Sequence, residues 1–172
     1  MSKRITCVAL FAPEDLAKIE SLVSVAGENN KVPCFVEGRE NLDTLPRHST
    51  LIAWDASLKE EIIKAFRTIK TGDMALEVSS VKLNQAKDKS YVLKFIVNWN
   101  ENLKQVQKAL YNLLPNERFE PNAYETHITI HADWDYEKIL KMQALINANF
   151  EPFTMKVDEI GIFEIYPAES IL

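Results

Sequence analysis

Apolar and polar residues alternate along this chain in patterns that predict strands interspersed with amphipathic helices. Short apolar runs at 5–11, 32–36, 74–83, 91–99, 153–158 and 160–165 are typical of strands. Apolar residues at helical spacing predict helices that begin near Pro13, Ser57, Asn100 and Asp135. The runs 74–83 and 91–99 flank a polar turn, which predicts an antiparallel hairpin. The order of elements therefore predicts an α+β protein.

Local signals refine the bounds of the predicted helices. Ser57 followed by Glu60 forms a capping box, and Gly72 is expected to end that helix. The helix from Asn100 to Leu114 is expected to be buried through Leu103, Val106, Leu110, Leu113 and Leu114, and the one after Asp135 through Ile139, Met142, Leu145 or Ile146, and Phe150.

Two further predicted strands carry the same tetrapeptide pattern of His, any residue, Thr and an aliphatic residue. The first copy is residues 48–51 and the second is residues 127–130. Because successive side chains of a strand point to opposite faces, His48 shares a face with Thr50, and His127 with Thr129. Each pair spans about 6.6 Å of strand, so both side chains can contact one phosphate. The repeat predicts phosphodiester cleavage if the fold brings the copies together.

The surroundings of the two motifs are also repeated. Each motif follows a polar connection, 37–47 and 116–125, and precedes a predicted helix. This repetition predicts one domain, residues 1–172, built from two pseudo-symmetric lobes. Each lobe is expected to be an antiparallel sheet with helices packed outside, and the two His-x-Thr strands are expected to line a central cleft.

Composition narrows the classes of function. The chain has 20 basic and 25 acidic residues and a net charge of -5, which disfavours the gripping of long duplex nucleic acid while leaving room for a local basic pocket. Its apolar runs are far shorter than a membrane span, and its first residues lead into a strand, so we expect a cytoplasmic protein without membrane contact. Cys7 and Cys34 are expected to be reduced core thiols. Nothing among the 4 glycines resembles a phosphate-binding loop, which argues against nucleoside triphosphate hydrolysis.

With these two motifs 79 residues apart, the chain resembles the 2H phosphoesterase superfamily, which includes the LigT-like RNA cyclic phosphodiesterases once called 2′-5′ RNA ligases. The resemblance extends over nearly the whole chain and implies the bilobal α+β fold described above. Many family members place Arg or Lys shortly after the second motif, where this chain has His131 and Asp133. If the alternation holds, His131 shares a strand face with His127 and takes the place of that cation. The alternative is that His131 is exposed at the surface or hydrogen-bonded in the core.

The resemblance implies a 2′,3′-cyclic phosphate substrate, on an RNA end or a small nucleotide, that is opened to a 2′-phosphate. It assigns His48 as the proton donor and His127 as the proton acceptor, with Thr50 and Thr129 on the non-bridging oxygens. No cofactor and no metal is expected, since on a strand His127 and His131 lie about 13 Å apart, too far to share a metal. Further candidates for substrate binding are Arg47, His131, Tyr124 and Trp54, and the protein is expected to be a monomer.

Two alternatives remain open from the residues alone. The same histidine pair suits cleavage of a linear 2′-5′ phosphodiester, or the reverse joining reaction. A non-catalytic module that binds RNA ends or nucleotides is the alternative from another class. Two matched groups for proton transfer favour an enzyme, because binding alone does not need them.

Overall fold

The computed structural model describes residues 4–27, 47–86, 89–115 and 121–165. Its strands and helices follow one another in the order β1 (Arg4–Phe11), α1 (Pro13–Ser24), β2 (Ser49–Asp55), a short 3₁₀ turn (Ala56–Leu58), α2 (Lys59–Phe66), β3 (Ala75–Gln85), β4 (Tyr91–Trp99), α3 (Glu101–Leu113), β5 (His127–Asp133), α4 (Tyr136–Asn149) and β6 (Phe153–Ile165). The predicted α+β class is confirmed. The strand predicted at 32–36 and the thiol of Cys34 lie outside the described residues.

All strand pairs in the described part of the chain are antiparallel, and their order β1-β2-β5-β4-β3-β6 closes on itself. The chain divides into two halves of the same order, strand-helix-strand-helix-strand, which end at β3 and β6. Exchanging β1 with β4, β2 with β5 and β3 with β6 leaves the strand order unchanged. The topology therefore has the internal twofold repeat that the two motifs predict.

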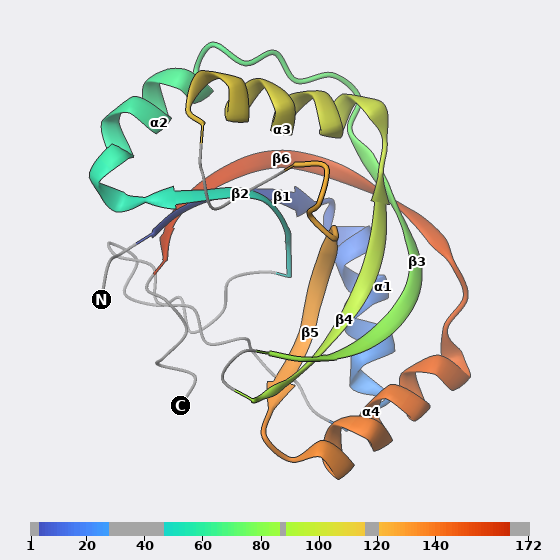
Figure 1. Ribbon diagram of the computed structural model, residues 1–172. Helices are drawn as coiled ribbons and strands as arrows, with labels where there is room; N and C mark the ends of the chain where they lie inside the picture. Colours follow the sequence, from blue (N-terminus) through green and yellow to red (C-terminus); the bar gives the residue numbers. More distant parts are fainter. Residues whose placement is uncertain (1–3, 28–46, 87–88, 116–120, 166–172) are drawn as a thin grey trace.

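The two predicted sheets are joined into one, and β6 makes the join. It was expected as two strands, but it is one strand of 13 residues. Its first part pairs with β3, from Phe153 to Lys156, and its later part pairs with β1. The break predicted at Glu159 is absent, and the strand instead bulges at Asp158, because Leu10 pairs with Glu159 and Phe11 with Val157. Figure 1 shows β6 passing from one lobe to the other.

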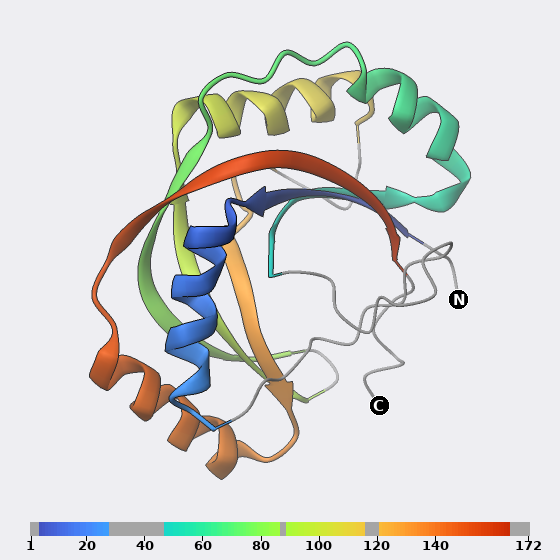
Figure 2. The ribbon, with the colours of Figure 1, turned by 180° about the vertical axis from the view of Figure 1, so that it is seen from behind.

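The helices pack outside the curved sheet in two pairs. Helix α1 contacts α4 at one end of the molecule, and α2 contacts α3 at the other, as Figures 1 and 2 show from opposite sides. Polar caps start two of them as predicted: the side chains of Asn100 and Asp135 accept hydrogen bonds from the backbone N–H groups of Leu103 and Lys138.

The start and end of α2 were predicted wrongly. The side chain of Asp55 caps the 3₁₀ turn before α2 by accepting a hydrogen bond from the backbone N–H of Ser57, and α2 itself starts after Leu58 without a side-chain cap. The helix ends at Phe66 rather than near Gly72, although Ile69 still packs against the core. Leu113 on α3 and Leu145 on α4 were expected to be buried but are exposed. The buried residues of α3 are Leu103, Val106 and Leu110 with Gln107, and those of α4 are Ile139, Met142 and Ile146.

One continuous core lies between the sheet and the helices. Cys7 is fully buried there, and burial raises the pKa of its thiol to about 12. Within the described ranges, no helix is long and apolar enough to cross a membrane.

Candidate active site

Strands β2 and β5 bring the two motifs together at a single backbone pair. Ser49 pairs with Ile128, and these are the second residues of the two motifs. The internal twofold axis therefore passes between them. In this antiparallel register His48 lies opposite Thr129, and Thr50 lies opposite His127. Directly opposite Cβ atoms lie about 5 Å apart and diagonal ones about 7–8 Å apart, so this register brings the two histidines and the two threonines close together.

Burial separates the two faces of the sheet at the motifs. Ser49 and Ile128 are fully buried toward the core, whereas His48, Thr50, His127 and Thr129 are all half-buried on the opposite face. We call this second face, which carries the two histidines and two threonines, the motif face. The sequence prediction that each His shares a face with its Thr agrees with this register.

Each motif strand bulges at the same position of its tetrapeptide. Between β1 and β2 the register skips Leu51, and between β4 and β5 it skips Ile130, the equivalent residue of the second motif. A bulge ends the regular alternation of faces. Because it follows the threonine in both copies, the His and Thr of each motif keep their shared face and the residues beyond it do not.

Buried side-chain donors hold both bulges. The Nε2 of Gln107 on α3 donates a 2.7 Å hydrogen bond to the carbonyl oxygen of Leu51. In the second motif, the Nη1 of Arg47 donates to the carbonyl oxygens of Thr129 and Ile130, at 3.0 and 2.6 Å. Glu20 on α1 accepts from the Nε of Arg47 at 3.0 Å. These bonds give Arg47 a structural role, and its predicted contact with substrate stays a prediction.

The tautomer of His127 follows from its surroundings. Its Nδ1 lies 2.8 Å from the backbone carbonyl oxygen of Glu125, and a carbonyl can only accept. Nδ1 therefore carries a proton, and the Nε2 of the neutral ring has a free lone pair. Burial and the charge of Lys94 lower the pKa of His127, against the opposing effects of the Glu125 carbonyl and carboxylate. The ring is thus predominantly neutral near neutral pH and suited to accept a proton.

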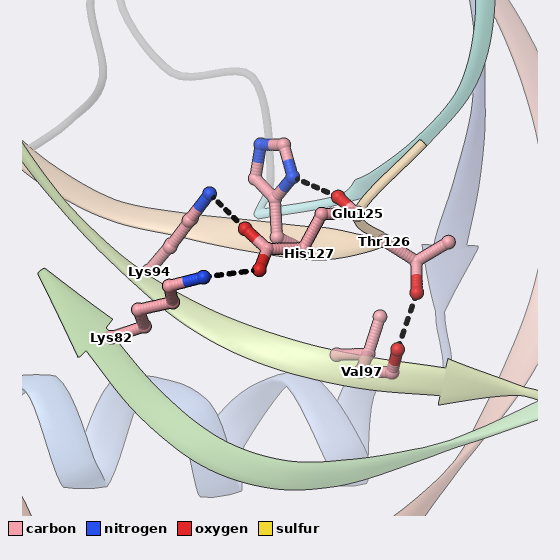
Figure 3. A network of polar contacts seen from close by, with 6 residues as sticks. All are labelled: Lys82, Lys94, Val97, Glu125, Thr126 and His127. Carbon is pink, nitrogen blue, oxygen red and sulfur yellow. Dashed lines mark hydrogen bonds and ion pairs between the residues drawn. The ribbon is translucent and has the colours of Figure 1, made fainter. Parts of the chain in front are cut away.

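Two lysines and one glutamate form an ionic cluster beside His127 (Figure 3). One carboxylate oxygen of Glu125 binds the ammonium group of Lys82, and the other binds that of Lys94 at 2.6 Å. The hydrogen bonds from Lys82 and Lys94 hold the pKa of Glu125 at about 2. Thr126 donates to the carbonyl oxygen of Val97, which holds the segment before His127 against β4.

Tyr124 connects the first motif with the second. Its hydroxyl is hydrogen-bonded to the side chain of Thr50, and burial raises its pKa to about 12. The phenol therefore stays protonated and can donate to Thr50. The Tyr124 ring centroid lies 5.8 Å from that of His127 and 6.4 Å from that of Trp99. Of the two aromatic candidates from the sequence, this one lies at the motifs.

The other two candidates lie away from the motif face. Trp54 is 3% exposed in the core, and its indole N–H donates to the carbonyl oxygen of Leu114 at 2.9 Å. His131 pairs with Leu93, whereas Thr129 pairs with Lys94 on the opposite face of β4, so the alternation expected for His131 ends at the bulge. The ring of His131 contacts Asp133 at 3.4 Å. Neither position fits the predicted contact with substrate.

Sequence reasoning missed Lys82, Lys94 and Glu125. Lys94 could have been recognised in the sequence, because it is a single charged residue between Leu93 and Phe95 in a largely apolar run. The structure places it opposite Thr129, where it is 9% exposed. A lysine is rarely buried so deeply without a partner. The neighbouring strand β4 thus supplies a cation beside the second motif.

Comparison with known proteins gives one family. The family described as "LigT like Phosphoesterase" matches residues 97–168, which include the second motif and the whole of β5 and β6. No curated protein matches the chain. Among solved structures, Usb1 from Kluyveromyces marxianus is similar with a TM-score of 0.47 and 11% sequence identity, over 95% of this chain and 98% of that chain. That likeness is too distant to support a conclusion.

Proposed function

We propose, from the similarity of residues 97–168 to the LigT-like phosphoesterase family and from the paired motifs, that the chain is a metal-independent phosphodiesterase that opens 2′,3′-cyclic phosphates, on RNA ends or small nucleotides, to 2′-phosphates. One observation carries the proposal: the pairing of Ser49 with Ile128, which sets two matched His-Thr pairs side by side. A pair of imidazoles on either side of a phosphate is suited to move one proton in and one proton out.

In the proposed reaction His127 is the general base. Its Nε2 takes a proton from water as the water oxygen forms a bond to phosphorus. The hydrogen bond from Nδ1 to the Glu125 carbonyl holds the ring in the required tautomer and stabilises the positive charge that the ring gains. The lowered pKa of His127 keeps the base in its neutral form.

His48 is the general acid on the other side of phosphorus. It donates a proton to the ribose 3′ oxygen as the bond from that oxygen to phosphorus breaks, which leaves a 2′-phosphate and a free 3′ hydroxyl. The hydroxyls of Thr50 and Thr129 donate to the non-bridging oxygens, whose negative charge grows in the transition state. Tyr124 orients Thr50 for this task by donating to its hydroxyl.

The direct test is hydrolysis of the four nucleoside 2′,3′-cyclic monophosphates in the presence of EDTA. We expect turnover to 2′-phosphates by the wild-type protein, and its loss in the His127→Ala variant. A 3′-phosphate product would reverse the direction of bond breakage that we propose. Absence of turnover on cyclic mononucleotides and on RNA with a cyclic phosphate end would contradict the function.

Two other activities share this site. The same histidines suit hydrolysis of a linear 2′-5′ phosphodiester or the reverse joining, and a 2′-5′ linked dinucleotide assayed in parallel distinguishes these reactions. A binding module without chemistry is distinguished by its response to substitution. Such a module would bind nucleotide without turnover, and its affinity would be unchanged when either His48 or His127 is replaced.

A further inference from the structure

A row of cations crosses the motif face beside the two histidines. Lys82 on β3 pairs with Lys94 on β4, and Lys94 pairs with Thr129 on β5. Neighbouring strands lie about 4.8 Å apart, so Lys94 is one strand and Lys82 two strands away from Thr129. Two like charges directly opposite each other destabilise a sheet. This pair therefore needs an anion.

Glu125 shows what kind of anion fits between the lysines. Its two carboxylate oxygens bind one ammonium group each, as two oxygens of a phosphate can (Figure 3). One carboxylate leaves a net positive charge on the cluster. The carboxylate is also accessible to exchange, because the side chains of Glu125 and Lys82 are 41% and 47% exposed. Lys94, by contrast, has a side chain that is 11% exposed and is held in place.

The internal repeat shows that the fold does not require these lysines. The twofold exchange puts Val8 in the place of Lys94, since Val8 pairs with Thr50 as Lys94 pairs with Thr129. It puts Gly161 in the place of Lys82, since Gly161 pairs with Val8. A Cβ at Gly161 would lie 2.5 Å from the Phe163 ring, so that position is closed to a side chain. The motif face is therefore cationic beside the second motif and apolar at the equivalent positions beside the first motif.

From this asymmetry we propose that Lys82 and Lys94 form a subsite for a second phosphate of the substrate, the 5′-phosphate of the nucleotide whose cyclic phosphate is opened. The phosphate displaces the carboxylate of Glu125 and binds both ammonium groups. The preferred substrate is then an RNA end or a 5′-phosphorylated nucleotide rather than a nucleoside cyclic phosphate. This inference rests on the proposed function.

The test compares kcat/KM for adenosine 2′,3′-cyclic phosphate with kcat/KM for the same compound carrying a 5′-phosphate. The two substrates differ by one phosphate and share the base and the reacting group. We expect the wild-type protein to prefer the 5′-phosphorylated substrate, and Lys82→Gln to reduce that preference about three- to tenfold, as expected for one partly exposed charged contact. Lys82→Arg should retain most of it.

Two further variants sharpen the comparison. Glu125→Gln removes the competing charge, so the preference for the 5′-phosphorylated substrate should rise, opposite to the effect of Lys82→Gln. Lys104→Gln makes the same change of charge on the exposed surface of α3 and is the matched control. Raising the salt concentration should lower the preference in the wild-type protein more than in Lys82→Gln.

The outcomes separate the two proposals. Equal preferences in Lys82→Gln and Lys104→Gln, with both substrates turned over, would overturn the second phosphate subsite and leave the proposed function standing. Absence of turnover on either substrate and on RNA with a cyclic phosphate end would overturn both.

Discussion

The Nδ1 of His127 lies 2.8 Å from the backbone carbonyl oxygen of Glu125, two residues earlier in the chain. The side chain of the same glutamate binds Lys94, the cation that lowers the pKa of His127. Residue 125 therefore acts on the proposed base twice: its carbonyl sets the tautomer, and its carboxylate offsets the neighbouring charge.

This arrangement predicts opposite shifts of the pH profile in two variants. Burial is the first cause that lowers the pKa of His127, and Lys94 lowers it further while Glu125 raises it. Lys94→Met should therefore raise this pKa, and Glu125→Gln should lower it. Because the base must be neutral, the acid limb of kcat/KM should move to higher pH in the first variant and to lower pH in the second.

The control for these profiles is Glu77→Gln. Glu77 lies on β3 and accepts a hydrogen bond from Asn98. Its replacement by Gln removes one negative charge, as Glu125→Gln does, but outside the ionic cluster. Its acid limb should coincide with that of the wild-type protein. Shifts of the same sign in Lys94→Met and Glu125→Gln would show that His127 does not set the limb.

Arg47 should matter for stability. Arg47→Met leaves the carbonyl oxygens of Thr129 and Ile130 without their buried donor, which is expected to lower the free energy of unfolding by about 1–3 kcal/mol. Glu20→Gln is the matched control, because the Glu20 side chain is 45% exposed and its ion pair is worth less than about 1 kcal/mol. Urea unfolding measures both. Equal losses in the two variants would show that the ion pair, not the carbonyl bonds, is what Arg47 contributes.

Tyr124→Phe separates the hydroxyl from the ring. The variant keeps the packing against His127 and Trp99 but loses the hydrogen bond to Thr50. We expect kcat to fall about fivefold, the effect of one neutral hydrogen bond, with KM nearly unchanged. Tyr111→Phe, on α3, is the control. Since the pKa of Tyr124 is about 12, the basic limb of the profile should be the same in the wild-type protein and in Tyr124→Phe; a limb that moves would contradict the role of Tyr124 as a constant donor.

Much of this arrangement was predictable from periodicity. Short apolar runs predicted β1 and β4, alternation predicted β5, and side-chain caps at Asn100 and Asp135 marked two helix starts, because these signals are local. The repeat of the His-x-Thr pattern also predicted the internal twofold order. These features depend on contacts between residues near in sequence, or on one motif copied twice.

The rest depends on register, which a single sequence does not encode locally. The bulge at Ile130 moves His131 off the motif face, and the bulges at Leu51 and Ile130 are stabilised by Gln107 and Arg47 from distant parts of the chain. Trp54 was misplaced for a similar reason, since its face is set by the bulge before it. The pairing of Lys82 with Lys94 is visible only once the hairpin register is known.

The central claim is that the two histidines perform one reaction as a unit. It is tested most directly by kcat/KM of the wild-type protein, His48→Ala, His127→Ala and the double variant on a 5′-phosphorylated 2′,3′-cyclic nucleotide, with circular dichroism to confirm that each is folded. Each single variant should lose about 10²- to 10⁴-fold, and the double variant should lose no more than the more impaired single variant, because the two groups act together. Near wild-type turnover by either folded single variant would contradict the claim.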